Sequence, residues 1–530
     1  MVMFRMRLLI LSSVILALIS SCVTNPGQAL LESDPPIRWE QYGPNLATLA
    51  RVSSRTIPDL SSRVYALIRS AEAAYELEVY SLAMSSLSRA QFLIQRVQSP
   101  ILQAELYSAL ARTYLAIDEP GDALLILTRA VDLVIQDLKL LEAPDIRSIQ
   151  VLEDIIYNLF ALGPEGFDQL RRAVQRVYLI PDYGQRVLLL TQIAAQYQTL
   201  GVGQRANLLL QQAIAALDAI TIPELRVRGY AAVARRFFSQ QDFPEANYYA
   251  SRAFTQLNNL NLSTTSTAQL DNLVQALTYL IEMDFTAEAT NLLFLLPSAS
   301  AQQSLLSSLA RQYFATGQPF AAELILQQLV QQVSAFFGTT TYVYGILRVV
   351  EQYREAEDEL SAEFFLERLV QAIINPTDPF PLDDVAYSEV LGSALRLGRL
   401  DLANSILSRM EDPYLSLIAL DRVVTFLQNS GQELLLEWTI EQIELQVSLF
   451  EQPIDDGQAR LALIYTRQGK GLQALQALDS IQNPYILSLT ASEMAFFLPP
   501  EVQDGLIDDI ENYILKYQPP PQNRWLFFNR

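Results

Sequence analysis

The stretch "ALARTYLAIDEPGDALLILTRA" (residues 109–130) contains a small residue, an aromatic residue three positions later, a turn with Pro and Gly, and an alanine nine positions after the aromatic residue. In this copy the three positions are Ala111, Tyr114 and Ala123. Apolar residues recur every three or four positions on both sides of the turn, which is the spacing of one face of an α-helix. The stretch therefore predicts two antiparallel helices that approach closely at the small residues, with the aromatic ring filling the gap between them.

The same offsets recur along most of the chain. Further copies are Ala194-Tyr197-Ala206, Ala234-Phe237-Ala246, Ala310-Tyr313-Ala322, Val350-Tyr353-Ala362 and Ala462-Tyr465-Ala474. More diverged copies are placed at Ala83, Ala287 and Ala403, and weaker ones at Gln169 and Leu436. The mean period is about 39 residues, and a final copy that begins at Pro484 brings the total to about twelve hairpins. Because one hairpin cannot bury both its faces, the hairpins must stack, and we expect an all-α solenoid over residues 58–517.

The order of residues within each copy resembles the tetratricopeptide repeat. The matching positions in one copy are Leu110, Ala111, Tyr114, Ala123, Leu127 and Ala130. The period is longer than the roughly 34 residues of that family, and its early tryptophan is replaced by residues such as Tyr107 or Tyr230. The resemblance implies that the first helix of each hairpin lines a concave surface, where polar residues hold protein or peptide partners.

The N-terminus, residues 1–21, has the layout of a secretory signal. Arg5 and Arg7 precede an apolar run of about a dozen residues, which is too short to span a membrane as a helix. The run ends in "ISSC" (residues 19–22), which resembles the lipobox of bacterial lipoproteins. The resemblance implies cleavage before Cys22, the only cysteine of the chain, and attachment of lipid to it. The alternative is an ordinary signal peptide that contains a cysteine by chance.

The resemblance to lipoproteins also implies a location in the cell envelope. The residue after the cysteine is Val23 rather than the aspartate that retains enteric lipoproteins in the inner membrane, which favours the outer membrane, facing the periplasm. Residues 22–57 are rich in Pro and Gly and predict a tether. Residues 518–530, "PPPQNRWLFFNR" with its preceding residue, form a Pro/aromatic tail that is expected either to cover the end of the last repeat or to dock on a partner.

The composition excludes several kinds of active site. The chain has no histidine and a single cysteine, so a Ser-His-Asp triad, a Cys-His pair and a histidine-ligated zinc cannot form from it alone. Its formal net charge of −21 disfavours nucleic acid as a partner. Acidic pairs occur at Asp383-Asp384, Asp455-Asp456 and Asp508-Asp509, where they are expected to begin helices rather than to catalyse. We therefore expect no catalytic residues, no metal site, no cofactor and no enzymatic activity.

A row of arginines is the main candidate for partner binding. Arg112, Arg235 and Arg311 each follow the small residue of a first helix, and Arg can hold a carboxylate through two parallel hydrogen bonds. Phe238 and Phe314 lie three positions further on and could supply apolar contacts. The alternative is that these arginines only pair with acids of adjacent repeats.

Together these features favour a lipid-anchored envelope scaffold that binds proteins or peptides. One alternative is an accessory or catalytic component of peptidoglycan or glycan processing, which would need a catalytic domain outside the repeats. Another is a carrier for an apolar ligand, which would need a large apolar concave surface.

Overall fold

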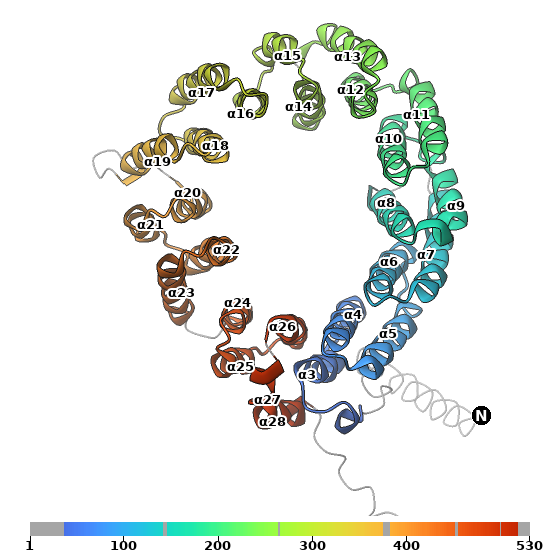
Figure 1. Cartoon of the computed structure of the whole chain (residues 1–530), viewed down its shortest axis with the longest axis vertical. Helices are drawn as coiled ribbons and strands as arrows, with labels where there is room; N and C mark the ends of the chain where they lie inside the picture. The colour runs from blue at the N-terminus through green and yellow to red at the C-terminus, as the bar shows by residue number, and fades with distance from the viewer. Residues whose placement is uncertain are drawn as a thin grey trace, which may run out of the picture. The chain divides into compact units, whose positions relative to one another are not determined.

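The computed structural model describes residues 37–140, 146–262, 265–374, 382–450, 454–498 and 500–517, and within these ranges all regular structure is helical. The all-α prediction is therefore confirmed (Figure 1). The signal segment, Cys22 and the tail 518–530 lie outside the described residues. No described helix is both long enough and apolar enough to span a membrane.

The helices divide into two compact units. Unit 1 comprises residues 1–134 and 452–530, and unit 2 comprises residues 135–451. Unit 1 contains η1 Trp39–Gln41, α3 Leu46–Ser53, η2 Ser54–Thr56, α4 Leu60–Glu76, α5 Tyr80–Ile94, α6 Pro100–Ala116, most of α7 Pro120–Leu140, α24 Asp455–Arg467, α25 Gly471–Asp479, α26 Pro484–Phe497, α27 Pro500–Asp504 and α28 Ile507–Tyr517. Unit 2 contains α8 Ile146–Ala161, η3 Gly163–Gly166, α9 Phe167–Val177, α10 Tyr183–Thr199, α11 Gly203–Leu217, α12 Pro223–Ser239, α13 Phe243–Asn258, α14 Thr267–Glu282, α15 Thr286–Leu293, α16 Ala299–Ala315, α17 Pro319–Ser334, α18 Thr340–Glu355, α19 Glu359–Ile374, α20 Asp384–Arg396, α21 Leu400–Leu407, α22 Pro413–Ser430 and α23 Glu433–Ser448.

Consecutive helices pair into antiparallel hairpins whose contact positions are those predicted. Ala111 and Ala123 are fully buried, and Tyr114 is 3% exposed between α6 and α7. The same holds for Ala194 and Ala206, which are fully buried between α10 and α11. The close approach of two helices at alanines, with an aromatic ring beside them, therefore holds each hairpin together.

The turn inside each hairpin has a recurrent backbone conformation. A residue with positive φ lies in the turn just after the first helix, as Asp118 does after α6. The next amide donates to the carbonyl of the aromatic position five residues earlier, as from Glu119 to Tyr114 at 2.8 Å. The positive-φ residues are Glu78, Asp118, Gly201, Gln241, Asp284, Gly317, Glu357, Gly398, Gly431 and Gly469. Each of them precedes the alanine position by five residues, which fixes the register of the repeats.

This register corrects two of the diverged copies. Asp284 places Ala289, and not Ala287, at the alanine position of the α14–α15 hairpin. The pattern was obscured there because Leu280 replaces the aromatic residue. The weak copy at Gln169 is three residues out of register, because the buried Leu170, Ala173 and Val177 of α9 match Leu210, Ala213 and Leu217 of α11, which places the buried Gly166 at the alanine position.

The connections between hairpins are held by a second recurrent contact. A side chain in the first turn or two of a first helix donates to a backbone carbonyl six residues earlier, in the preceding connection. The pairs are Gln103 to Val97 at 2.6 Å, Arg186 Nε to Ile180 at 3.0 Å, Arg226 Nε to Ile220 at 2.9 Å and Gln302 to Leu296 at 2.7 Å. These bonds satisfy carbonyls that the preceding helix leaves without an intrahelical partner.

In unit 2 the hairpins form two layers. The first helices α10, α12, α14, α16, α18, α20 and α22 contact one another in sequence order, and the second helices pack behind them. Figure 1 shows the first helices on the concave side of this unit. The predicted role of the first helices as the inner layer is therefore confirmed for unit 2.

Unit 1 joins helices from the two ends of the chain. α26 packs against both α3 and α4, and the Ser488 hydroxyl donates to the carbonyl of Ala50 at 2.8 Å. Arg69 of α4 also pairs with Glu493 of α26 at 3.4 Å. The end of the last repeat is thus in contact with the first helices of the body. The tail, expected either to cover this end or to dock on a partner, lies outside the described residues.

The predicted tether, residues 22–57, overlaps this packed region. All eight residues of α3 are buried, and the side chain of Asn45 caps the helix by accepting from the amide of Thr48 at 2.8 Å. The helical body therefore begins by Leu46 rather than at residue 58. Sequence analysis missed α3 because its eight residues contain no aromatic position of the repeat and directly follow the turn at Gly43 and Pro44.

Candidate functional site: a groove lined by three arginines

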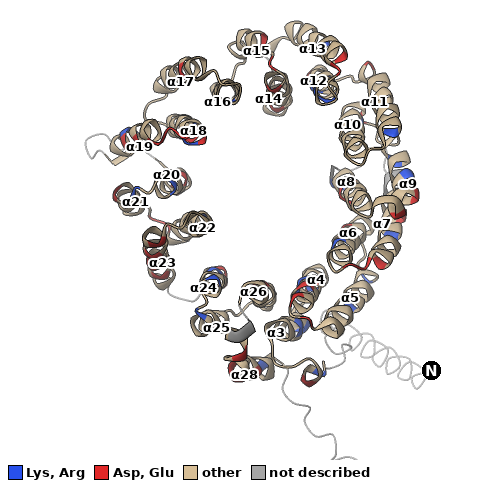
Figure 2. Cartoon of the chain, in the orientation of Figure 1, with Lys and Arg blue, Asp and Glu red and all other residues tan. Residues whose placement is uncertain are grey.

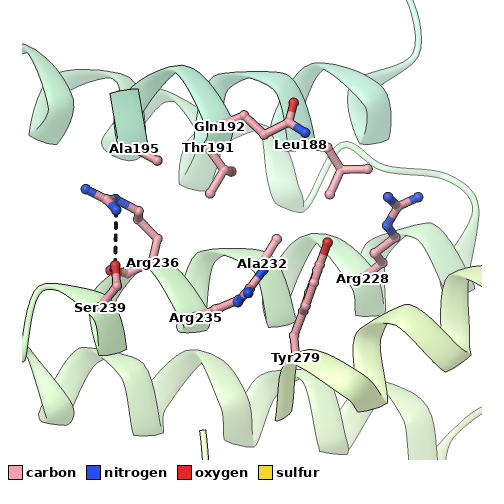
Figure 3. Close-up of a pocket in the computed structure, with 10 residues that line it drawn as sticks. All are labelled: Leu188, Thr191, Gln192, Ala195, Arg228, Ala232, Arg235, Arg236, Ser239 and Tyr279. Carbon is pink, nitrogen blue, oxygen red and sulfur yellow. Dashed lines mark hydrogen bonds between the residues drawn. The ribbon is translucent and has the colours of Figure 1, made fainter. Parts of the chain in front are cut away.

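A groove of about 280 Å³ lies on the inner layer of unit 2, between α10, α12 and α14. Figure 3 shows the residues that line it. These are Leu188, Thr191, Gln192 and Ala195 of α10, Arg228, Ala232, Arg235, Arg236 and Ser239 of α12, and Tyr279 of α14. The groove therefore runs along three successive first helices, on the face that the repeat pattern assigns to partner binding.

The three arginines are all supplied by α12, whose basic positions are visible in Figure 2. This helix begins with Pro223 at its first position, where the missing amide hydrogen would have no partner. Arg228 and Arg235 are seven residues apart and so share a helix face. Arg236 follows at one end of the groove, beside Ala195, while Arg228 lies at the other end (Figure 3).

Arg235, in the middle of the groove, is already paired. Its Nη2 lies 2.8 Å from Oε2 of Glu282 on α14, and its guanidinium lies 4.8 Å from the ring centroid of Tyr279. Both partners belong to the next first helix, so the contact links adjacent repeats. The side chains of Arg235 and Glu282 are 51% and 44% exposed, so this ion pair contributes about 1 kcal/mol or less to stability.

Among the described residues, the hydrogen bonds of the Arg228 and Arg236 side chains go to neutral groups. Arg228 Nη1 donates to Oδ1 of Asn272 at 3.0 Å, and Arg236 Nη1 donates to the hydroxyl of Ser239 at 3.1 Å. In the described part of the chain, Nε of Arg228, and Nε and Nη2 of Arg236, are buried without a hydrogen-bond partner. Burial lowers the pKa of Arg236 from its ordinary value, because it removes water from the charged guanidinium.

The three arginines predicted to bind a partner lie in three different surroundings. Arg235 lines the groove just described, and Arg311 and Phe314 line a second hollow of about 310 Å³ between α16 and α18. Arg311 Nε donates to Oε2 of Glu355 at 3.0 Å, so it too is paired with the next first helix. Arg112 belongs to unit 1 and is exposed, and among the described residues no ion pair to it is found.

Phe238 packs within its own hairpin. Its ring packs edge-on against Phe243 at 5.6 Å between centroids, across the turn of the α12–α13 hairpin. The bracing contacts that we considered as the alternative are therefore present for Arg235 and Arg311, while partner binding at Arg112, Arg235, Arg311, Phe238 and Phe314 stays a prediction.

Sequence analysis missed Arg228, Arg236 and Tyr279 as members of the groove. The seven-residue spacing of Arg228 and Arg235 was a usable signal, because it puts both on one helix face. No sequence pattern indicated Tyr279, because the repeat in the α14–α15 hairpin was assigned two residues out of register.

A mostly apolar hollow, which also contains the acidic side chain of Glu153, adjoins the groove. It has a volume of about 150 Å³, lies between α8 and α10, and shares Gln192 with the groove. Its lining includes Tyr157, which is 62% exposed, and the aliphatic Ile156. A bound segment could therefore meet both charged and apolar groups on neighbouring helices.

The acidic pairs begin helices, as predicted. Asp383 caps α20 by accepting from the amide of Ala386 at 2.9 Å, and Asp384 accepts from the amide of Asp412 at 2.6 Å. Asp455 accepts from the amides of Gln482 and Asn483. Asp508 and Asp509 lie in the first turn of α28. In the described part of the chain, no group of three or more acidic, histidine or cysteine residues is arranged to hold a metal ion.

Comparison with known proteins gives no family. No protein-family model and no curated protein matches the chain. Among solved structures, it is similar to Ton1535 from Thermococcus onnurineus NA1, with 13% identity over 81% of this chain and 98% of that one and a TM-score of 0.25. It is also similar to a circular tandem repeat protein (13% identity, 88% and 98% covered, TM-score 0.18) and to the APC/C hetero-tetramer Cut9–Hcn1 (15% identity, 84% and 92% covered, TM-score 0.19). TM-scores of this size carry no argument about function.

The helices and the groove define the class of this protein: an all-α solenoid of antiparallel helical hairpins with an arginine-lined groove on its inner layer. Its hairpins repeat the order of small residue, aromatic residue, left-handed turn and alanine.

Proposed function

We propose that this protein is a non-catalytic scaffold that binds protein or peptide partners along the inner layer of unit 2. The groove on α10, α12 and α14 carries the proposal, because it presents three guanidinium groups beside the apolar hollow at Tyr157. Guanidinium groups and exposed aromatic rings are the side chains most enriched at protein interfaces.

Arg235→Glu tests the binding role. The change places two carboxylates side by side, Glu282 and the new glutamate, and reverses a charge in the groove. We expect crosslinked recovery of partners from intact cells to fall at least fivefold, while the melting temperature changes little, because the Arg235–Glu282 pair is exposed.

The matched control is Arg171→Glu. Arg171 forms an exposed ion pair with Asp168 on α9, in the same unit but outside the groove. A lower melting temperature with unchanged partner recovery in Arg235→Glu would show that Arg235 only braces neighbouring repeats.

We further propose that the protein is anchored by lipid on Cys22 in a bacterial cell envelope, in the outer membrane and facing the periplasm. The support is the order of charged, apolar and small residues before Cys22 in the sequence. Two acyl chains or more give stable membrane attachment, since each buried methylene contributes about 0.8 kcal/mol.

Cys22→Ser tests the anchor. We expect the variant to incorporate no fatty-acid label and to leave the membrane fraction, because serine lacks the thiol that receives the lipid. The native chain, labelled in parallel, is the control. Equal incorporation into both chains would contradict lipidation at this residue.

A further inference from the structure

The groove leaves two positive charges unmatched in a chain that is rich in acids. The sequence has 58 Asp and Glu against 37 Lys and Arg, so carboxylates are the more abundant partner. Arg235, Arg311, Arg354, Arg399 and Arg422 each pair with one. Arg228 and Arg236 have only neutral contacts in the described structure, and both retain buried nitrogens without a partner. The buried nitrogens are closed to a ligand in the groove, but each guanidinium keeps its positive charge without a carboxylate partner among the described residues, so both residues attract a bound carboxylate.

The charge is distributed unevenly along the groove. Glu282 neutralises Arg235 in the middle, where Ala232 and the ring of Tyr279 also lie. Arg236 and Arg228 occupy the two ends (Figure 3). The groove is therefore positive at each end and close to neutral between them.

The distance between the two ends follows from helix geometry. Arg228 and Arg236 are eight residues apart on α12, which is about 12 Å along the helix axis. An extended peptide advances about 3.3 Å per residue, so three to four residues span this distance.

We propose that the groove binds an extended peptide segment that carries two carboxylates three to four residues apart, one held by Arg236 and the other by Arg228, with uncharged residues between them. The inference rests on the proposed scaffold function and specifies its ligand. The middle of the segment lies over Ala232 and Tyr279, where Glu282 disfavours a further acid.

Fluorescence anisotropy on the full chain in detergent tests the spacing. The probes are fluorescein-labelled peptides of serine and glycine with two glutamates four positions apart, two adjacent glutamates, or one glutamate and one glutamine four positions apart. We expect the spaced di-glutamate peptide to bind at least tenfold more tightly than either of the others, since each charge-assisted contact is worth about one order of magnitude or more. This comparison needs no variant of the protein.

Variants then assign the two ends. Arg236→Gln and Arg228→Gln should each lower the affinity for the spaced di-glutamate peptide at least tenfold. The remaining affinity should be close to that of the single-glutamate peptide for the native chain. Arg171→Gln, outside the groove, should change nothing, and circular dichroism checks that all three variants fold.

Equal affinity of the spaced and adjacent di-glutamate peptides would overturn the inference, because it would show attraction by net charge alone. The scaffold proposal would still stand if Arg235→Glu reduced partner recovery. Conversely, partner recovery could stay unchanged in Arg235→Glu while the spaced peptide still binds more tightly than the adjacent one. That result would contradict the scaffold proposal and leave a groove that binds acidic peptides.

Discussion

Ending the chain after residue 483 is expected to unfold α3 at the opposite end of the sequence. The truncation removes α26 and α28, both of which pack against α3. Leu46, Leu49 and Val52 are at most 1% exposed, and burial of each such side chain contributes about 1.5–3 kcal/mol. We therefore expect α3 to lose its protection from amide hydrogen exchange and unit 1 to lose about 4 kcal/mol or more of stability.

The matched control ends the chain after residue 517, which removes only the Pro/aromatic tail. Because α26 and α28 remain, we expect the exchange protection of α3 to stay as in the full chain. Protection of α3 that survives loss of residues 484–530 would show that α4 alone holds it in place.

Gly345→Ala is expected to destabilise unit 2, although alanine is the better helix former by about 1 kcal/mol. A Cβ atom at this position of α18 would lie 2.3 Å from Cγ2, 2.7 Å from Cγ1 and 3.1 Å from Cβ of Val333 on α17. Valine in a helix has one strongly preferred rotamer, so its side chain cannot turn away. The overpacking should cost about 1–3 kcal/mol net, measured as a lower midpoint of denaturant unfolding.

The control for this prediction is a double-mutant cycle with Val333→Ala. Removing both γ-carbons of Val333 makes room, so the cost of Gly345→Ala should largely disappear in that background. An equal cost in both backgrounds would mean that the clash lies elsewhere.

The hairpins were predictable because their signal is local. Ala111, Tyr114 and Ala123 lie within one short stretch, and the same offsets recur where helix contacts require small residues. The copy around Leu280 was misread because two of its positions carry leucine, and its true register is visible only in the positive φ of Asp284. α3 was missed because it lacks the repeat offsets, and because part of its packing comes from α26, as far away in the sequence as the 438 residues that separate Ser488 from Ala50.

The site was predictable only in part. The position after the small residue correctly indicated the inner face, which put Arg235 in the groove. The same rule said nothing about which charges remain unmatched, because that depends on contacts between successive repeats. Arg235 pairs with Glu282 on the next first helix, while Arg236, one residue further on, hydrogen-bonds in the described part of the chain to Ser239 of its own helix.

The contact between α3 and α26 has a consequence for biosynthesis. The carbonyl of Ala50 emerges from the ribosome 438 residues before its partner Ser488. At about 5–20 residues per second, translation separates the two by roughly 20–90 s. During that interval α3 can pack only against α4, so the part of its surface that α26 and α28 cover in the finished protein stays exposed on the nascent chain.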